Sequence, residues 1–436
     1  MRRKLAQYGL SALLYPAAIL PTAGLADDTA GQTASPTLPG TPNEPAPSIF
    51  TFGGFGTLGV VHSDQPLADF TSSAVEGVGA GHTHAWSAAV DSLAAAQVGA
   101  RITPQFSAVL QVLSEQNADS SFSPHVEWAF ITYQVTPDFS LRAGRTDLDV
   151  FLLTDSRNIG FAFPFVRPPV ELYDLVPVTN SDGIDFSYRL PMLGGSSTLD
   201  ASIGHSLNHY RISDSDATGT ANATQLLTLV DTLQRGSMTL KISYGEARLT
   251  VPALDPLFDA FREFGSEGIA IANRYDVNAR MVRFYGLSAD YQPADWFVMA
   301  ELGRVNYNSV FGEITGWYVT GGHRFGRFTP YATYAQTRPN SSTRAPGLDL
   351  SAIPPSQATA AAVLDAGLDT VLARIASQRT SSLGARFDVT SNIDLKFQWD
   401  HTNLGSNSQG WLTNLQPGFR PGSSFTLVSA SLDFVF

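Results

Sequence analysis

The final stretch Phe425–Phe436 reads FTLVSASLDFVF and alternates strictly between two kinds of side chain. Counting back from Phe436, every second residue is apolar as far as Val428, and the residues between them include Asp433 and two serines. Successive side chains of a strand point to opposite faces, so this period of two predicts a β-strand with one apolar and one polar face. Such a strand either borders a soluble core or separates lipid from water.

The composition favours the lipid boundary. The chain has 436 residues, of which 43% are hydrophobic and only 15% charged. This charged fraction is below the roughly 25% of an average soluble protein. Beyond the N-terminal stretch, no segment offers the ~20 consecutive apolar residues of a membrane helix. A weakly charged chain whose apolar residues are spread singly along strands is typical of a transmembrane β-barrel.

Alternating segments recur about sixteen times between residues 49 and 436. They are joined in turn by short connections rich in Pro, Gly, Asn or Asp and by long ones, with one brief exception near residues 308–312. This alternation of short and long connections predicts an all-β, antiparallel, up-and-down barrel with short periplasmic turns and long external loops. The expected long loops cover residues 62–94, 115–123, 146–180, 209–221, 249–278, 338–378 and 404–423.

The two faces of the strands predict what lines the barrel. In residues 393–401, Ile393 and Phe397 share one face, whereas Asp394 and Lys396 share the other. In a barrel that spans lipid the charged face must point into a wet lumen, because a Lys or Arg facing lipid at the midplane costs roughly 2–4 kcal/mol. The predicted pore-lining residues are Glu127, Asp185, Arg189, Lys241, Arg386, Asp388, Asp394, Lys396 and Asp400.

The N-terminal region indicates export. Residues 1–26 combine MRRKL, an apolar stretch and the small-residue end GLA, which together predict a signal peptide cleaved after Ala26. The Pro-rich residues 27–48 form an expected periplasmic tail, and residues 49–436 form the barrel domain. Cleavage removes three cations and no acid, so the net charge moves from −12 to −15, which argues against a nucleic-acid partner. The chain has no cysteine for disulfides or thiol chemistry.

Three stretches, FTFGGFGTLG at residues 50–59, LRAGR at 141–145 and LDFVF at 432–436, resemble the Gram-negative general porins. The resemblance implies an outer-membrane channel that is trimeric and sixteen-stranded and needs no cofactor. Outer-membrane lipid and lipopolysaccharide would surround it, and small hydrophilic solutes would pass through it. It also implies that the aromatic end is read by the barrel-assembly machinery, so the expected assembly signal is Leu432, Phe434 and Phe436.

The third long loop, residues 146–180, is the candidate constriction. Its apolar stretch FAFPFV would pack the loop against the inner wall, which favours a loop folded into the lumen over a solvated one. Arg101 and Arg142 occupy polar-face positions on early strands, and cations facing loop carboxylates would create a transverse field. The predicted constriction residues are Arg101, Arg142, Asp147, Asp155, Arg157, Arg167, Glu171 and Asp174.

Other patterns carry less information. Helical periodicity at residues 255–265 and 356–377 predicts helices in the external loops. His82 and His84 lie two residues apart on a loop without a fixed carboxylate nearby, so no metal site is predicted. The sequence has no GxSxG motif, which disfavours a hydrolase. The preferred function is passive diffusion through a porin; a substrate-specific channel and, less favoured, an outer-membrane enzyme or adhesin stay open as alternatives.

Overall fold

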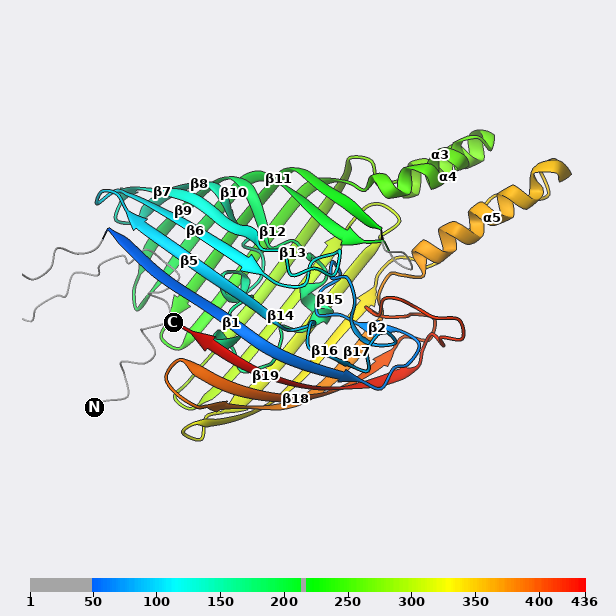
Figure 1. Ribbon diagram of the computed structural model, residues 1–436. Helices are drawn as coiled ribbons and strands as arrows, with labels where there is room; N and C mark the ends of the chain where they lie inside the picture. The colour runs from blue at the N-terminus through cyan, green and yellow to red at the C-terminus, as the bar shows by residue number, and fades with distance from the viewer. Residues whose placement is uncertain (1–48, 213–216) are drawn as a thin grey trace, which may run out of the picture.

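The computed structural model describes residues 49–212 and 217–436. The expected signal peptide (1–26) and the expected tail (27–48) lie outside the described residues. Within the described chain, one closed barrel of antiparallel strands dominates the structure (Figure 1). The predicted all-β class is therefore confirmed.

Sixteen long strands form the barrel wall, and each pairs with its neighbours in sequence. The sheet closes because β1 pairs with both β5 and β19, which leaves no open edge. The strands are β1 (Phe50–Ser63), β5 (Leu93–Arg101), β6 (Phe106–Ser114), β7 (His125–Thr136), β8 (Phe139–Asp147), β9 (Asn180–Met192), β10 (Gly195–Arg211), β11 (Thr218–Arg235), β12 (Met238–Thr250), β13 (Arg280–Tyr291), β14 (Trp296–Asn306), β15 (Glu313–His323), β16 (Phe328–Pro339), β17 (Gln378–Asp388), β18 (Ile393–Leu404) and β19 (Ser424–Val435).

Short turns gather at one end of the barrel and long loops at the other, as predicted (Figure 1). The fourth long loop is the exception. It was expected to span residues 209–221, but β10 extends to Arg211 and β11 begins at Thr218. The polar residues at these two strand ends pair with each other, from Ser206 with Ala223 to Arg211 with Thr218. Backbone pairing therefore continues beyond the apolar alternation that marked the strand ends in the sequence.

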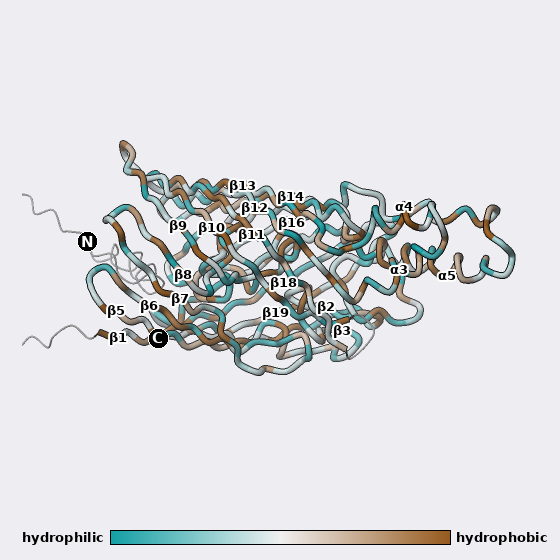
Figure 2. Tube along the Cα trace, turned by 90° about the horizontal axis from the view of Figure 1, so that it is seen from above, coloured by the Kyte–Doolittle hydropathy of each residue, from teal (hydrophilic) through white to brown (hydrophobic). Residues whose placement is uncertain are grey.

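The polarity of the wall is the reverse of that in a soluble protein. Ile184, Phe186 and Phe397 are exposed on the outer face, whereas Asp185 and Lys396 are buried inside the barrel. Figure 2 shows the resulting alternation of hydrophilic and hydrophobic residues along the strands. The outer face thus suits lipid and the inner face suits water, as the alternation predicted.

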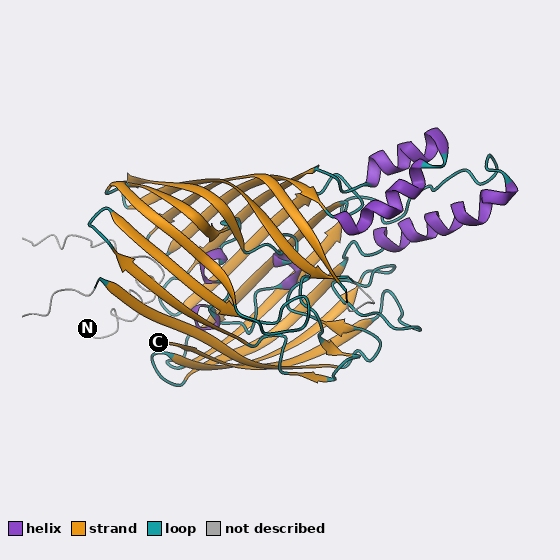
Figure 3. Ribbon diagram, turned by 45° about the horizontal axis from the view of Figure 1, so that its top comes forward, coloured by secondary structure: helices purple, strands orange, loops and turns teal. Residues whose placement is uncertain are grey.

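The third loop, residues 148–179, folds into the barrel. It contains three short helices, η1 (Thr154–Ser156), η2 (Gly160–Ala162) and α2 (Val170–Tyr173), which Figure 3 shows inside the ring of strands. The predicted apolar packing is present, because Phe163 and Phe165 belong to a buried cluster with Tyr318 of β15. Ordinary apolar burial therefore holds this loop against one side of the inner wall.

Helices from two external loops project beyond the barrel (Figures 1 and 3). After η3 (Pro252–Leu254), α3 (Asp255–Arg262) packs against α4 (Gly265–Tyr275) and against α5 (Pro355–Leu372). The sequence predicted α3 and α5 but missed α4. Gly265, expected to end the first helix, has φ +65° and instead joins α3 to α4. Within the described residues, none of the helices has the length and apolar character needed to cross a membrane.

Candidate pore and its lining

The candidate pore is a cavity of about 660 Å³ between the third loop and the inner wall. Its lining comes from the first loop (64–92), the second loop (115–124), the third loop and the adjoining strands. Many of the residues that line it are polar or charged. The titratable lining residues include Glu76, Asp91, Glu115, Asp119, His125, Glu127, Arg157, Arg167 and His209.

The third loop leaves this space open because it is bound to the opposite wall. The carboxylate of Glu301 on β14 accepts hydrogen bonds from Tyr173 Oη at 2.7 Å and from the Leu152 backbone N–H at 2.7 Å. Tyr318 and Ser288 from the wall donate to the same carboxylate, at 2.8 Å each. One buried carboxylate thus fixes two separate points of the loop, and hydrogen bonds to a charged group are among the strong ones.

Wall cations bind the loop backbone directly. Lys396 Nζ donates to the Gly160 carbonyl at 2.5 Å and lies 3.1 Å from the Asp433 carboxylate. Arg386 donates to the Phe161 carbonyl at 2.6 Å. Lys241 pairs with Asp149 and also donates to the Phe151 carbonyl at 2.8 Å. These contacts explain why the inner wall of a pore carries several fully buried charges.

Arg167 forms the opposite arrangement, in which the loop supplies the cation and its surroundings supply the acids. Its guanidinium donates to both carboxylate oxygens of Asp91, at 2.7 and 2.6 Å, and lies 3.4 Å from Asp400 on β18. It also donates to Ser429 Oγ at 2.6 Å. The third loop is therefore joined to the first loop as well as to the wall.

A cover over part of the barrel is made by the first and eighth loops. Asp69 and Phe70 (β2) pair with Ala80 and Gly81 (β3), and β4 (Trp86–Ser87) pairs with β1. Asp69 is fully buried, and its carboxylate accepts hydrogen bonds from Thr83 and from Asn414 of the eighth loop (405–423). Phe70 of the first loop and Leu412 of the eighth loop belong to one buried apolar cluster, which also contains Val170 of the third loop. The cover therefore closes the β18–β19–β1 side of the barrel.

Acidic groups on the first and second loops lie close to the cavity. Burial raises the pKa of Glu115 to about 7, and the charge of Glu127 adds to that rise. Burial also raises the pKa of Glu76, whose carboxylate accepts a hydrogen bond from Ser72 Oγ at 2.6 Å. Although 37% of the Glu115 side-chain surface is exposed, the protein atoms around the carboxyl raise its pKa more than the charges of His125 and Arg157 lower it. This side of the pore can change its charge near neutral pH.

Arg157 is a second third-loop cation that lines the cavity, beside Arg167. Its guanidinium lies 5.4 Å from the ring centre of Tyr173, and in the part of the chain that the structure describes no ion pair is found for it. Its positive charge lowers the pKa of Glu115 and of Asp174, against the larger effect of burial. Arg157 thus acts electrostatically on both of these acids.

The structure places the predicted constriction residues in several environments. Arg101 is exposed at the short-turn end of β5, six residues beyond Ala95, which packs beside Phe161 of the third loop. At 3.3 Å per residue this separation is about 20 Å, so the prediction that Arg101 faces the third loop is wrong. Arg142 does lie on the inner wall, but it lies 3.0 Å from both Asp147 and Asp185.

The loop acids also differ from one another. Burial raises the pKa of Asp155 to about 6, together with the charges of Asp147 and Asp149. Glu171 is buried and accepts hydrogen bonds from Gln378 and Thr380, so it fixes the loop to β17 and does not face open water. Asp174 accepts the Ala74 backbone N–H at 3.2 Å. Of the eight predicted constriction residues, Arg157 and Arg167 line the cavity.

The predicted pore-lining residues likewise divide into groups. Glu127 lines the cavity, and Asp185, Lys241, Asp394, Lys396 and Asp400 are buried inside the barrel. Arg386 contacts the third loop, its neighbour Asp388 lies at the end of β17, and Arg189 is exposed near the turn that follows β9. The sequence reading missed Glu76, Asp91, Glu115 and His125. No pattern in the sequence could have shown that the first two loops line the same cavity as the third.

Solved structures share this architecture. An anion-selective porin from Comamonas acidovorans matches 89% of this chain and 99% of its own, with TM-score 0.50 and 12% identity. The chain has a porin fold. The outer membrane channel DcaP of Acinetobacter baumannii matches 89% of this chain and 97% of its own, with TM-score 0.51 and 12% identity. No protein-family profile matches the sequence, and no curated protein sequence matches it either.

Proposed function

We propose that the protein is an outer-membrane porin through which small hydrophilic solutes and ions diffuse passively. The observation that carries this proposal is the water-accessible cavity beside an in-folded third loop, within a barrel whose outer face is apolar. The porin fold supports it. No energy source or cofactor enters the proposal, because diffusion down a gradient needs only an open, polar path.

Arg157 and the acids facing it set the ion preference in this proposal. Replacing Arg157 with Ala removes the loop cation for which no ion pair is found among the described residues, so the channel should become more selective for cations, with a small rise in conductance. Reversal potentials and single-channel conductance in planar bilayers test this. The matched control is Arg344→Ala, which removes an exposed arginine from an external loop. Unchanged reversal potentials in Arg157→Ala would contradict the role of Arg157 in the pore.

A substrate-specific channel is the second candidate, because the third loop fills much of the lumen. The remaining 660 Å³ falls within the roughly 300–1,000 Å³ range of small-molecule sites. Liposome swelling with sugars of graded size separates the two. Uptake that falls smoothly with size supports the general porin, and uptake of one solute class alone supports the specific channel. An intact barrel that passes nothing would favour an enzyme or adhesin.

We also propose a homotrimer. Small side chains on the outer face of β5 and β6 support close contact between copies. The small residues are Ala94, Ala96 and Ala108. Sedimentation in density-matched detergent should give three times the protomer mass, and a protomer mass would reject the trimer.

Export through the Sec pathway is part of the same proposal. The mature protein should begin at Asp27, as the small residues ending at Ala26 predict. Intact-protein mass of outer-membrane material should therefore lack residues 1–26. A mass that includes them would reject the cleavage site.

A further inference from the structure

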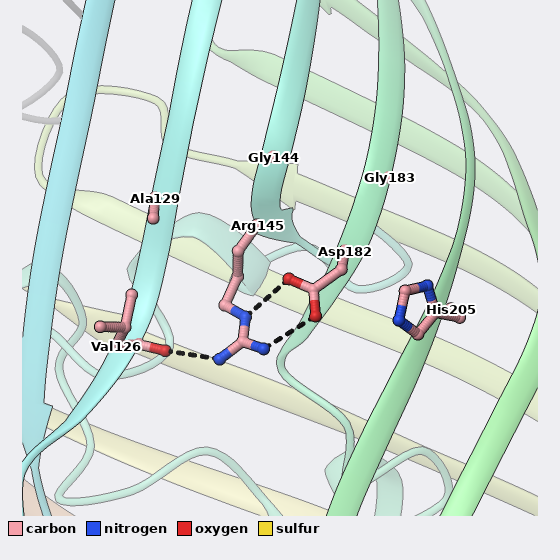
Figure 4. A pocket seen from close by; sticks show the side chains of 7 residues that line it. All are labelled: Val126, Ala129, Gly144, Arg145, Asp182, Gly183 and His205. Carbon is pink, nitrogen blue, oxygen red and sulfur yellow. Dashed lines mark hydrogen bonds and ion pairs between the residues drawn. The ribbon is translucent and has the colours of Figure 1, made fainter.

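The cavity beside the third loop is lined by more acids than bases. Its lining residues include five carboxylates and three arginines. Two of these arginines are already paired. Arg167 binds Asp91. Arg145 donates to both carboxylate oxygens of Asp182, each at 2.8 Å, on the outer face of β8 and β9 (Figure 4). That leaves Arg157 for the other four carboxylates. They are Glu76, Glu115, Asp119 and Glu127.

One wall of the cavity presents hydrogen-bond acceptors that lack partners. Glu115 is the residue after β6, Gln116 follows it, and both line the cavity. Gln116 is only 6% exposed, yet its Oε1 atom has no hydrogen-bond partner within the part of the chain that the structure describes. No hydrogen bond to the Glu115 carboxylate is found among these residues either, and His125 Nε2 lies 4.0 Å from it.

His125 of β7 contributes a third acceptor to this wall. Its Nε2 atom lies 3.6 Å from the Glu127 carboxylate, which favours the tautomer that carries the proton on Nε2. In that neutral form Nδ1 is an acceptor, and it has no partner among the described residues. Buried polar atoms are rarely left without hydrogen bonds. A wall of acceptors is therefore complemented by a ligand that supplies donors.

The spacing of these groups is too wide for a metal ion. Within residues 49–212 and 217–436, no three His, Asp or Glu side chains are grouped so that they could hold one. The imidazole of His125 instead lies between Glu115 and Glu127, with its Nε2 atom 4.0 and 3.6 Å from their carboxylates. This arrangement suits a larger cation with several N–H donors, such as an ammonium or guanidinium group.

We propose that Glu115, Gln116, His125 and Glu127 form a binding site for small organic cations that carry N–H donors, such as alkylguanidinium and alkylammonium solutes. We name these four residues the acceptor wall. Glu115 supplies the carboxylate that binds the cation, Gln116 Oε1 accepts one of its N–H groups, and the charge of Glu127 adds to the attraction. This inference rests on the proposed function, because the solute must enter the pore, and it deepens that function by naming a solute class.

Cation binding at the acceptor wall should displace a proton. Burial raises the pKa of Glu115 to about 7; the charge of Glu127 adds to this rise, and those of His125 and Arg157 oppose it. The charge of Glu115 in turn contributes to the raised pKa of Glu76. The Glu115 carboxyl is neutral below its pKa and attracts a cation above it. Between about pH 6 and about pH 8 its charged fraction rises about tenfold, so the affinity for the cation should rise about tenfold as well.

The test compares three probes that differ in charge and in N–H donors. Methylguanidinium has both, N-methylurea has donors and a similar shape without the charge, and tetramethylammonium has the charge without donors. Isothermal titration calorimetry on the full mature protein, folded in zwitterionic detergent at about pH 8, measures the binding of each. Methylguanidinium should bind about tenfold more tightly than either of the other probes, since a hydrogen bond to a charged group is worth about that factor.

Two substitutions separate the charge of the acceptor wall from its amide acceptor. Glu115→Gln keeps the shape and removes the charge, so it should weaken methylguanidinium binding about tenfold and reduce the pH dependence. Gln116→Leu removes the amide acceptor and keeps the charge, so it should weaken methylguanidinium binding several-fold and leave tetramethylammonium binding unchanged. The matched control Glu263→Gln removes an exposed carboxylate between α3 and α4 and should bind all three probes as the wild type does.

Several results would overturn the proposal. They are the absence of methylguanidinium binding, equal binding of methylguanidinium and either of the other probes, and unchanged binding in folded Glu115→Gln. Calorimetry needs no conducting channel, so the two proposals can fail separately. A protein that conducts ions but does not bind methylguanidinium would contradict the acceptor wall alone. A protein that binds methylguanidinium but conducts no ions would support the acceptor wall and contradict the porin function.

Discussion

Arg167 of the third loop donates two hydrogen bonds to the carboxylate of Asp91 in the first loop, at 2.7 and 2.6 Å. Both residues are buried, and the same guanidinium lies 3.4 Å from Asp400 on the barrel wall. One side chain thus joins two external loops and a strand at the edge of the candidate pore. The position of the third loop depends on this contact as well as on its apolar packing.

Replacing Arg167 with Ala should loosen the third loop and destabilise the protein. The change leaves Asp91 and Asp400 buried without their cation. Breaking a buried pair in this way costs about 3–5 kcal/mol in a dry interior, and less beside a water-filled cavity. The temperature at which gel mobility changes should fall, and single-channel conductance should rise and become noisier.

Arg344→Ala is the control for this variant, because it removes an exposed arginine from the external loop that carries α5. It should change neither stability nor conductance. If Arg167→Ala also leaves both measurements unchanged, the ion pair does not hold the loop.

Replacing Glu301 with Gln should detach a different part of the third loop. Glu301 accepts four hydrogen bonds, two on each carboxylate oxygen. In glutamine an NH2 group replaces one of these oxygens, so it faces two partners that are themselves donors. A loss of about 1.5–3 kcal/mol is expected from the weakened contacts to the charged group. Thermal unfolding of detergent-folded protein measures it. The control is Glu263→Gln, which changes an exposed residue between α3 and α4 and should leave the unfolding temperature unchanged. Equal unfolding temperatures for the two variants would contradict the prediction.

Ion selectivity should change with pH through Glu115. Burial raises the pKa of this carboxyl to about 7, so it binds a proton below that pH and carries a negative charge above it. As pH rises through neutrality the cavity gains negative charge, and reversal potentials should shift toward cation selectivity. Glu115→Gln should reduce that shift, whereas Glu263→Gln should keep it. A full pH response in Glu115→Gln would assign the titration to other groups, such as Glu76 or His125.

The fold was predictable because its main features are local in the sequence. A period of two fixes which residues face lipid, and the alternation of short and long connections fixes the barrel. Asp394, Lys396 and Phe397 lie on the predicted faces. The apolar FAFPFV stretch also predicted the in-folded third loop, because apolar residues in a long loop must be buried somewhere.

The site was less predictable because side-chain parity gives the face of a strand and not the height along the pore. Arg101 has the predicted parity, yet it lies at the short-turn end of its strand. Pairing between loops is non-local as well: Arg167 meets Asp91, which is 76 positions earlier in the chain. The predicted field between separated loop acids and wall cations is largely replaced by direct contacts such as Asp147 with Arg142.

Deleting Phe436 should reduce outer-membrane assembly in cells more than refolding in detergent. The last residue closes the barrel, since its backbone N–H donates to the Gly54 carbonyl at 3.0 Å and its carbonyl accepts from the Gly54 N–H at 3.1 Å. Its ring lies over Gly54, where a Cβ atom would approach ring carbon Cζ to 2.4 Å. These contacts are few beside the full β1–β19 pairing from Phe55 to Ser63. Stability should therefore change little, and recognition of the aromatic end during assembly should suffer more.

Outer-membrane levels by immunoblot and refolding yield by heat-dependent gel mobility measure the two effects separately. Phe328→Ala is the matched control, because Phe328 is an exposed aromatic residue at the same end of the barrel, on β16. It should leave both levels near those of the wild type. Equal losses in cells and in detergent would mean that Phe436 acts through stability, and unchanged levels in cells would reject the assembly role of the terminal aromatic residue.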